Sequence, residues 1–336
     1  MTDNKDKIIF FASGDFAIPT LEQMIADGFN IKGIVTSTKD KIRFNKKTIK
    51  DIACENNIPF YLINKSVEMK DKSFIEWIKS FDADYFCVIS FKKLPDEILN
   101  MPKKSAFNVH ASLLPELRGA APINWAIRLG HLKTGLTAFE LTNEIDKGKI
   151  IDNVECKIYV HDNFATLFNR LSLMCKDFTI NLFNNKEIKG TKIQNELIDN
   201  CKAPKLGRDY FHKWYNKNII ECKNILRSVY PFDGLPISIY VHYNNGEEES
   251  LNRLNAKIYA FQYSVCTESS NTLFFKDYNE TITDKKNYLV IKHKNGHTIY
   301  ITEIQLEGRK KLSIEEFLRG FKYFKKDGYK VSVGYY

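Results

Sequence analysis

The chain has 336 residues, of which 43% are hydrophobic and 27% are charged, and its formal net charge is +9. This composition is typical of a globular protein, and the length is enough for two domains that each bury a core. No run approaches the roughly 18 consecutive apolar residues that a membrane-spanning helix needs, and the first residues, MTDNKDKIIFFAS, do not have the pattern of a leader peptide. We therefore expect a cytoplasmic protein.

The cysteines and the basic residues indicate which metal sites, disulfides and partners to expect. The seven cysteines are scattered and none lies in a C-x-x-C pair, which favours reduced thiols over a disulfide framework or a zinc site. We therefore expect no bound metal. The excess of basic residues is spread over both parts of the chain, which fits a polyanionic partner that contacts both parts and fits a plain role in solubility equally well.

The first part of the chain alternates apolar runs with helical patterns. Such an alternation predicts a Rossmann-like, mainly parallel sheet with helices on both faces. In sheets of this kind ligands bind beyond the carboxyl ends of the strands. The apolar runs are KIIFFA (7–12), NIKGIVTS (30–37), YFCVISF (85–91) and SAFNVH (105–110), and the helical patterns lie near 15–26, 47–57 and 70–80.

The pattern changes further along the chain. Two more strands between 134 and 158, joined by NEID, and a helix over about 163–184 complete a first domain, 1–188. Residues 189–208 have no sustained period and predict a linker. Within 209–336, a helix near 216–229 precedes the alternating runs ISIYVHY, AKIYAFQYSV, NYLVIKH and HTIYITEIQL, which predict a small antiparallel barrel or sandwich. Ser313 and Glu316 have the spacing of a capping box at the start of a last helix.

Several common catalytic motifs are absent from the sequence. The turn after the first strand, ASGDFAIP, contains neither G-x-G-x-x-G nor G-x-x-x-x-G-K-[ST], and no G-x-S-x-G is present. What remains is Asn108 and His110, two residues apart at the end of an apolar strand, and Asp146 in NEIDKG. Period-2 alternation directs the Asn108 and His110 side chains to one face of the strand.

Asparagine, histidine and aspartate together suit acyl transfer to an amine. The carbonyl oxygen becomes an oxyanion in the tetrahedral intermediate, and an amide and an imidazole N–H aimed at that oxygen stabilise it. A carboxylate beside the histidine holds its tautomer and helps to relay the proton that the amine loses. Asp146 is also open to a plainer interpretation as a turn acid of a hairpin.

The same residues resemble a known family. NVHASLLPELRGAAPINWAI, followed by TGLTAFELTNEIDKGKI, is similar to the folate-dependent formyltransferases. The resemblance implies that Asn108, His110 and Asp146 are catalytic and that the formyl donor is 10-formyltetrahydrofolate. It further implies a folate-side loop and strand made of Ser112, Leu113, Leu114, Pro115, Val88, Ile89, Ser90, Phe91 and Leu94.

The resemblance extends to the second half of the chain. CKAPKLGR, NILRSVYPFDGLP and IQLEGRKKLSIEEFLRGF are similar to the linker and the RNA-side domain of the members that act on tRNA, an OB-like barrel. The implied partner is initiator methionyl-tRNA, bound by a monomer. The basic residues that we expect to contact it are Lys41, Arg43, Lys46, Lys47, Lys205, Arg309, Lys310 and Lys311.

Two departures from the family pattern keep alternatives open. The first turn reads ASGDF where the family usually has GTPDF, and the basic segment STKDKIRFNKK is shorter than its counterpart. The short segment favours an N-formyltransferase that acts on a nucleotide-linked amino sugar. A non-catalytic tRNA- or folate-binding paralogue is the alternative of another class. The basic segment is open to interpretation as a solvated face, and Arg118 as either a ligand contact or a local pair.

Overall fold

A computed structural model describes residues 5–37, 44, 47–185, 188–195, 202–207, 214–244, 249–264, 281–293, 296–325 and 329–335. The chain divides into two compact units. The first comprises Met1–Ala126, His131–Asp162 and Thr166–Lys205, and the second comprises Leu206–Tyr336 with the short segments Ile127–Gly130 and Asn163–Ala165. None of the described helices is long and apolar enough to cross a membrane.

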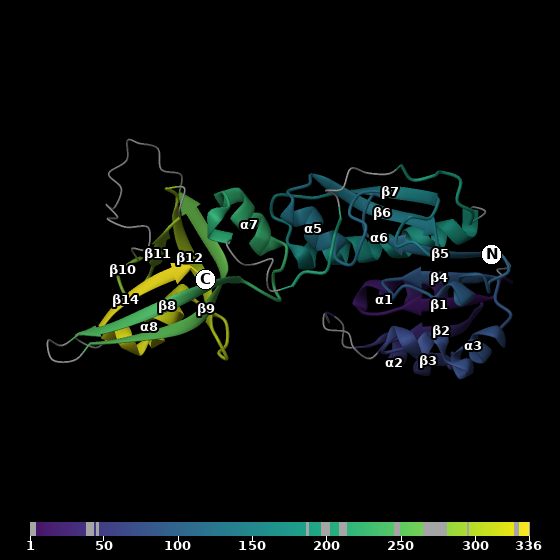
Figure 1. Cartoon of the computed structure of the whole chain (residues 1–336), viewed down its shortest axis with the longest axis horizontal. Helices are drawn as coiled ribbons and strands as arrows, with labels where there is room; N and C mark the ends of the chain where they lie inside the picture. Colours follow the sequence, from purple (N-terminus) through teal and green to yellow (C-terminus); the bar gives the residue numbers. More distant parts are fainter. Residues whose placement is uncertain are drawn as a thin grey trace. The chain divides into compact units, whose positions relative to one another are not determined.

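The first unit is built on a seven-stranded sheet in the order β3-β2-β1-β4-β5-β6-β7 (Figure 1). Strands β1 to β5 are parallel, whereas β6 and β7 run antiparallel to their neighbours. The strand order reverses between β1 and β4, and this is where open α/β sheets place their ligands. The strands are β1 (Ile8–Ala12), β2 (Ile31–Thr36), β3 (Phe60–Leu62), β4 (Tyr85–Ile89), β5 (Ser105–His110), β6 (Lys133–Glu140) and β7 (Ile150–Lys157).

Helices cover both faces of this sheet, which explains why β1 and β4 are apolar throughout. The ring of Phe183, in α6 (Phe164–Asn185), contacts the rings of Tyr85 and Phe107 on one face. Phe86 and Val88 point to the other face, where they join a core that includes Phe74 of α3 (Lys72–Lys79). The remaining helices of this unit are α1 (Ile18–Ala26), α2 (Ile49–Glu55), α4 (Asp96–Leu99) and α5 (Pro122–Arg128).

The second unit is a curved antiparallel sheet in the order β10-β11-β12-β9-β8-β14, with β13 paired to β12. The backbone N–H of Val333 in β14 donates to Thr281 Oγ1 in β10 at 2.8 Å, so the two ends of the sheet nearly close into a barrel. Its elements are α7 (Ile219–Arg227), β8 (Leu235–Asn244), β9 (Glu249–Ser264), β10 (Thr281–Thr283), β11 (Leu289–Lys292), β12 (Thr298–Leu306), β13 (Leu312–Ser313), α8 (Ile314–Gly320) and β14 (Tyr329–Tyr335).

These two sheets confirm the predicted fold class, a Rossmann-like domain followed by a small barrel. The capping box of α8 is also confirmed, because Ser313 Oγ accepts from the Glu316 N–H and a Glu316 carboxylate oxygen accepts from the Ser313 N–H. Strand β3 was not predicted from the sequence. It has three half-buried residues, too few to show a period.

Parts of the predicted linker lie on the first unit. The backbone N–H of Ile150 in β7 donates to the Lys192 carbonyl at 2.7 Å, and Gln194 is buried. Further along, the N–H of Ala203 donates to the Arg118 carbonyl at 2.8 Å and the N–H of Ala121 to the Ala203 carbonyl at 3.0 Å. Both described segments of this stretch are therefore held by backbone hydrogen bonds.

A buried carboxylate fixes the turn before α6, and we predict its effect on stability. Asp162 is 1% exposed and pairs with Arg170. Burial raises the pKa of Asp162, but hydrogen bonds from Arg170, the Tyr159 N–H and Thr166 outweigh it and hold the pKa below 3.8. We expect Asp162→Asn to lower the free energy of unfolding by about 2–3 kcal/mol at pH 7, because Arg170 loses its charged partner.

Urea titrations at pH 7 and pH 3 measure this effect. A carboxylate whose pKa is lowered by folding contributes its stability fully above about pH 5 and loses it as the pH falls through the folded-state pKa. The difference between wild type and Asp162→Asn should therefore shrink at pH 3. Asp177→Asn, at an exposed ion pair with Lys176, is the matched control and should leave stability unchanged. An equal loss at both pH values would contradict the assignment.

Candidate active site

Asn108 and His110 lie at the carboxyl end of β5, between β4 and β6. Asn108 is level with Val88 of β4 and Phe139 of β6, and His110 is level with Thr137. His110 is buried, while Asn108 is half-buried and its side chain makes no hydrogen bond with another described residue. The alternation of the strand places both side chains on one face, as predicted. The Asn108 amide is therefore available to a ligand, two residues before the buried imidazole of His110.

The His110 ring is held from both sides. Its Nε2 lies 3.0 Å from the Leu117 carbonyl oxygen, which can only accept, so Nε2 donates in this contact. Its Nδ1 lies 3.9 Å from Asp146 Oδ2. This separation is longer than a hydrogen bond but within ion-pair range, and contacts of this kind often shorten when substrate binds. The structure therefore brings His110 and Asp146 together across 36 residues of sequence.

The Asp146 carboxylate is positioned by backbone. Its Oδ2 accepts a hydrogen bond of 2.8 Å from the Gly119 N–H, in the loop that follows β5. Two residues on, the backbone of Gly148 passes so close to β6 that a Cβ there would lie 1.6 Å from the Glu140 carbonyl oxygen. Only glycine fits such an approach. The D-x-G spacing therefore has a physical reason: the glycine lets the β6–β7 connection close against the sheet and present Asp146 to His110.

A glutamine that the sequence did not single out supports the same loop. Gln194 is 8% exposed and uses both ends of its amide. Its Nε2 donates to the carbonyl oxygens of Asp146 and Gly148 at 3.0 and 2.7 Å, and its Oε1 accepts from Arg118 Nε and Nη2 at 3.1 and 2.8 Å. Arg118 therefore pairs within the protein, but with a residue 76 positions further along the chain rather than with a neighbour in sequence.

The segment Ser112–Pro115 is fixed beside His110 by β6. Thr137 Oγ1 donates to the Ser112 carbonyl at 2.7 Å and accepts from the Leu114 N–H at 3.0 Å, while Ser112 Oγ donates to the Glu116 carbonyl at 2.6 Å. Leu114 packs with Phe139 and Ile150 in a small apolar cluster. The turn therefore forms a rigid wall next to the strand end.

The other residues predicted on the folate side form the end of β4 and the loop after it: Val88, Ile89, Ser90, Phe91 and Leu94. Ser90 has a φ of 51°, and its carbonyl accepts from the Ser13 N–H at 3.1 Å, which ties the loop after β4 to the loop after β1. The ring of Phe91 lies 5.7 Å from that of Phe11. Because Val88, Ile89 and Leu94 are buried, a ligand at this edge meets mainly backbone groups, the exposed Ser90 and the half-buried Phe91.

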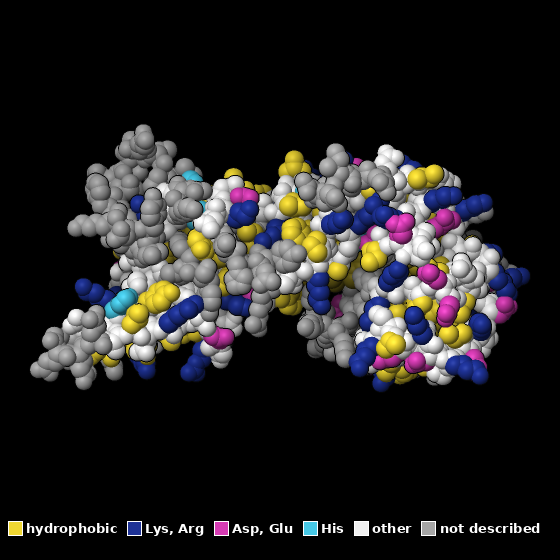
Figure 2. Space-filling model, viewed as in Figure 1, with side chains coloured by type: hydrophobic (Ala, Val, Ile, Leu, Met, Phe, Trp, Pro, Cys, Tyr) yellow, Lys and Arg dark blue, Asp and Glu magenta, His cyan; other side chains and the backbone are white. Residues whose placement is uncertain are grey.

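The predicted tRNA-contacting cations of the first part of the chain differ in their surroundings. Lys41, Arg43 and Lys46 lie outside the described residues. Lys47 forms an ion pair with Glu55 at 2.7 Å, and Lys205 is exposed. Over the first unit, Lys and Arg side chains are interleaved with Asp and Glu on the face shown in Figure 2 rather than gathered into one patch.

In the second unit the three consecutive cations have different surroundings. Lys311 pairs with Glu303 at 3.2 Å and lies over the ring of Tyr230 at 4.7 Å. Arg309 and Lys310 are exposed and form no ion pair with any described carboxylate. These two cations are therefore more accessible to an anionic partner than Lys311 is.

The fold and the strand-end site are those of an enzyme suited to acyl transfer to an amine. In the part of the chain that the structure describes, no group of three His, Cys, Asp or Glu side chains is placed to hold a metal ion. Residues 6–179 match the formyl transferase family and residues 209–322 match the formyl transferase C-terminal domain. The chain belongs to the formyl transferase family, as its motifs indicated.

Curated relatives match the chain over nearly its whole length. The methionyl-tRNA formyltransferase of Azobacteroides pseudotrichonymphae is 30% identical over 96% of this chain and 98% of its own length. That of Bacteroides thetaiotaomicron is 30% identical over 97% and 98%, respectively. Among solved structures, the sugar 3N-formyl transferase WlaRD has a TM-score of 0.58 at 21% identity, covering 91% of this chain and 99% of its own, and shares the fold.

The hydrogen bonds of Gln194 generate a prediction about formyl transfer. Gln194→Glu keeps the acceptor for Arg118 but removes the donor to the Asp146 and Gly148 carbonyls. We expect turnover to fall about 10- to 100-fold, because small displacements of a reacting group cost that much, while KM changes little. The two carbonyls that lose their donor also lower the melting temperature, but the protein stays folded at the assay temperature. Steady-state kinetics with thermal melts measure both quantities.

Gln23→Glu is the matched control. Gln23 also donates from its amide, to Asp27 Oδ1 at 2.8 Å, but on an exposed helix surface away from β5. Its replacement should leave turnover unchanged. Wild-type turnover in Gln194→Glu would remove Gln194 from the positioning of Asp146, as would a loss of activity that merely follows loss of folded protein.

Proposed function

We propose that this protein transfers the formyl group of 10-formyltetrahydrofolate to the α-amine of methionine esterified to initiator tRNA. The observation that carries the chemistry is the convergence of Asn108, His110 and Asp146 at the carboxyl end of β5. The acceptor is supported by curated relatives named methionyl-tRNA formyltransferase, which match both parts of the chain rather than the first alone.

In the proposed reaction the amine nitrogen attacks the formyl carbon. A new C–N bond forms, the carbonyl oxygen becomes an oxyanion, and the bond between that carbon and N10 of the folate then breaks. The amine proton passes through water towards N10, with His110 and Asp146 beside its path. The Asn108 amide donates to the oxyanion. Because Nε2 of His110 already donates to the Leu117 carbonyl, the donor that His110 supplies is its Nδ1–H, on the side of the ring where Asp146 lies. Each such donor is typically worth about 10² to 10³ in rate.

Asp146 acts on His110 rather than on the substrate. Its charge lies on the Nδ1 side of the ring, while the Leu117 carbonyl holds the Nε2 side, so the ring plane is set before substrate binds. A preorganised donor of this kind does not have to reorient when charge develops. The methionyl ester also matters, because an ester lowers the basicity of the α-amine and leaves more of it neutral and nucleophilic near pH 7.

The alternative acceptor is a nucleotide-linked amino sugar. Two solved structures that share the fold favour this acceptor: WlaRD, a sugar 3N-formyl transferase, in the presence of dTDP, and an N-formyltransferase of Helicobacter canadensis in complex with dTDP-3-aminofucose. Their identities to this chain are 21% and 19%, against about 30% for the curated relatives. The third possibility, a non-catalytic paralogue, is disfavoured by the intact arrangement around His110.

An acceptor assay tests this proposal. The purified full-length protein is incubated with 10-formyltetrahydrofolate and either initiator methionyl-tRNA or dTDP-linked amino sugars, and formylated product is quantified. We expect kcat/KM for methionyl-tRNA to exceed that for the sugars by at least about 100-fold, since buried site groups discriminate strongly between acceptors.

Two results would overturn the proposal. Formylation of the sugars alone would show that the acceptor is wrong while the chemistry is right. Formylation of neither acceptor, with an active formyltransferase run in parallel as a positive control, would show that the protein does not catalyse this transfer.

A further inference from the structure

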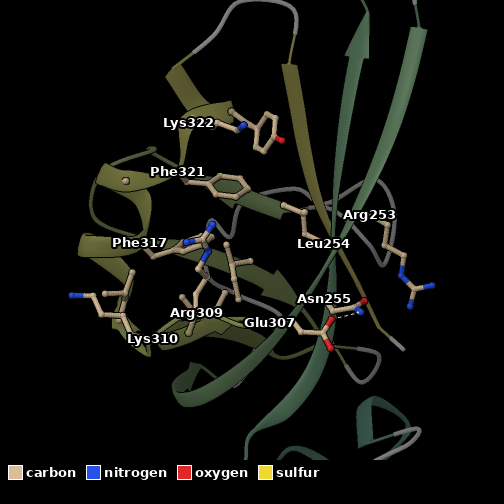
Figure 3. Close-up of a pocket in the computed structure, with 14 residues that line it drawn as sticks. Arg253, Leu254, Asn255, Glu307, Arg309, Lys310, Phe317, Phe321 and Lys322 are labelled. Carbon is tan, nitrogen blue, oxygen red and sulfur yellow. Dashed lines mark hydrogen bonds between the residues drawn. The ribbon is translucent and has the colours of Figure 1, made fainter.

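The second unit contains a pocket of about 800 Å³ between β9, β12 and the segment that begins at α8 (Figure 3). It is built from residues that are distant in sequence, from Arg253 on β9 to Tyr323 after α8. Its size falls in the range of about 300–1,000 Å³ in which proteins hold small ligands. The formyl-transfer chemistry at β5 makes no use of it.

One side of the pocket is apolar and rigid. Leu254, Leu306, Leu312 and the ring of Tyr323 are partly buried and pack on the core of the barrel. Beneath them, the rings of Phe317 and Phe321 stack with centroids 4.9 Å apart. The Phe321 ring also meets that of Tyr323 edge-on at 5.4 Å. The wall is therefore preformed, with an aromatic ring at its surface.

The rim of the pocket is cationic. Arg309, Lys310 and Lys322 are exposed and have no carboxylate partner within ion-pair distance among the described residues, and Arg253 also lines the pocket. Glu307 is its one acidic lining residue, and the Asn255 amide donates to its carboxylate at 2.8 Å. In Figure 3 the Phe321 ring lies between Lys322 on one side and Arg309 with Phe317 on the other, whereas Arg253 and Lys310 point outward.

The pocket combines an apolar, aromatic wall with the cations Arg309 and Lys322. A ligand that suits it has an apolar or aromatic part for the wall and an anionic group for the cations. Lys322 Nζ lies 5.0 Å from the centroid of the Tyr323 ring. A purely apolar segment would leave Arg309 and Lys322 without an anionic partner, and a bare phosphate would leave the wall unused. A nucleotide satisfies both, because its base packs on aromatic and aliphatic side chains while its phosphate pairs with arginine and lysine.

We propose that this pocket binds a nucleotide, with the base against Leu254 and Tyr323 and the phosphate on the rim, where Arg309 and Lys322 lie on either side of Phe321. The ligand is either a free nucleoside phosphate or an unpaired nucleotide of an RNA. The site goes beyond the proposed formyl transfer and stands whichever acceptor the catalytic site takes.

Calorimetric titration of the full-length protein tests this site. The probes are the four nucleoside monophosphates, ribose 5-phosphate, a single-stranded RNA hexamer and a fully paired RNA hairpin. We expect ribose 5-phosphate to bind at least about 10-fold more weakly than the preferred nucleotide or hexamer, because it lacks the base. Stronger binding of the hexamer identifies RNA as the source, and stronger binding of a monophosphate identifies a free nucleotide.

Paired variants locate the binding. Arg309→Gln with Lys322→Gln should weaken binding at least about 10-fold and reduce its salt dependence, while Lys285→Gln with Lys286→Gln, which removes two exposed charges outside the pocket, should change it less than about 2-fold. Tyr323→Leu should weaken binding of the base-containing probe alone. Tyr300→Leu, on a half-exposed ring of β12 that does not line the pocket, is its control.

Four results would overturn the assignment. Equal binding of ribose 5-phosphate and the nucleotide would leave only a phosphate site. Equal binding of the paired hairpin would leave only a charged surface. Equal effects of the pocket variants and their controls, or no binding of any base-containing probe at millimolar concentration, would show that the pocket does not hold a nucleotide.

Discussion

One carboxylate, that of Asp146, joins the two loops that make the candidate site. It accepts from the Gly119 N–H in the loop after β5 and faces His110 Nδ1 at the end of that strand. The hydrogen bond between Asp146 and Gly119 holds the β6–β7 connection to the loop after β5. It also keeps the negative charge of Asp146 beside the His110 ring. The glycine at 148 and the amide of Gln194 serve this placement, because both bring the Asp146 backbone against the sheet.

The sheet supplies the rigidity that this contact needs. β5 lies between β4 and β6, so the backbone of Asn108 is paired on both sides, and that of His110 is paired with Thr137 of β6. The strand order reverses next to β4, and the loops after β1 and β4 meet through Ser13 and Ser90. A substrate at this edge therefore meets loops that are already held in place. The polar side chains of Asn108 and His110 lie at the end of the apolar strand β5. This is the physical reason that Asn108 and His110 share one face.

Much of this was predictable from local sequence. Period-2 alternation placed Asn108 and His110 together, the alternation of strands and helices predicted the mainly parallel sheet, and the Ser313–Glu316 spacing marked the start of α8. These features depend on neighbouring residues. The role of Gln194 was not predictable, because its amide reaches 46 and 48 residues back and its own segment has no period.

The surroundings of the basic residues were likewise not predictable from the sequence. Arg309, Lys310 and Lys311 are consecutive and appear equivalent in the sequence. In the structure Lys311 is engaged by Glu303, Tyr230 and Tyr259, while Arg309 lines a pocket whose other walls come from β9 and from residues after α8. Composition shows charge, but only the tertiary fold shows which cations remain accessible.

A double-mutant cycle on single-turnover formyl transfer tests most directly whether His110 and Asp146 act as one unit. His110→Ala removes the imidazole, and Asp146→Asn keeps an oxygen for the Gly119 N–H but removes the charge. We expect each variant to slow transfer about 100-fold and the double variant to be no slower than the slower single variant, because residues that act together are not additive. Multiplicative losses approaching 10,000-fold, or wild-type rates in either single variant, would contradict the account.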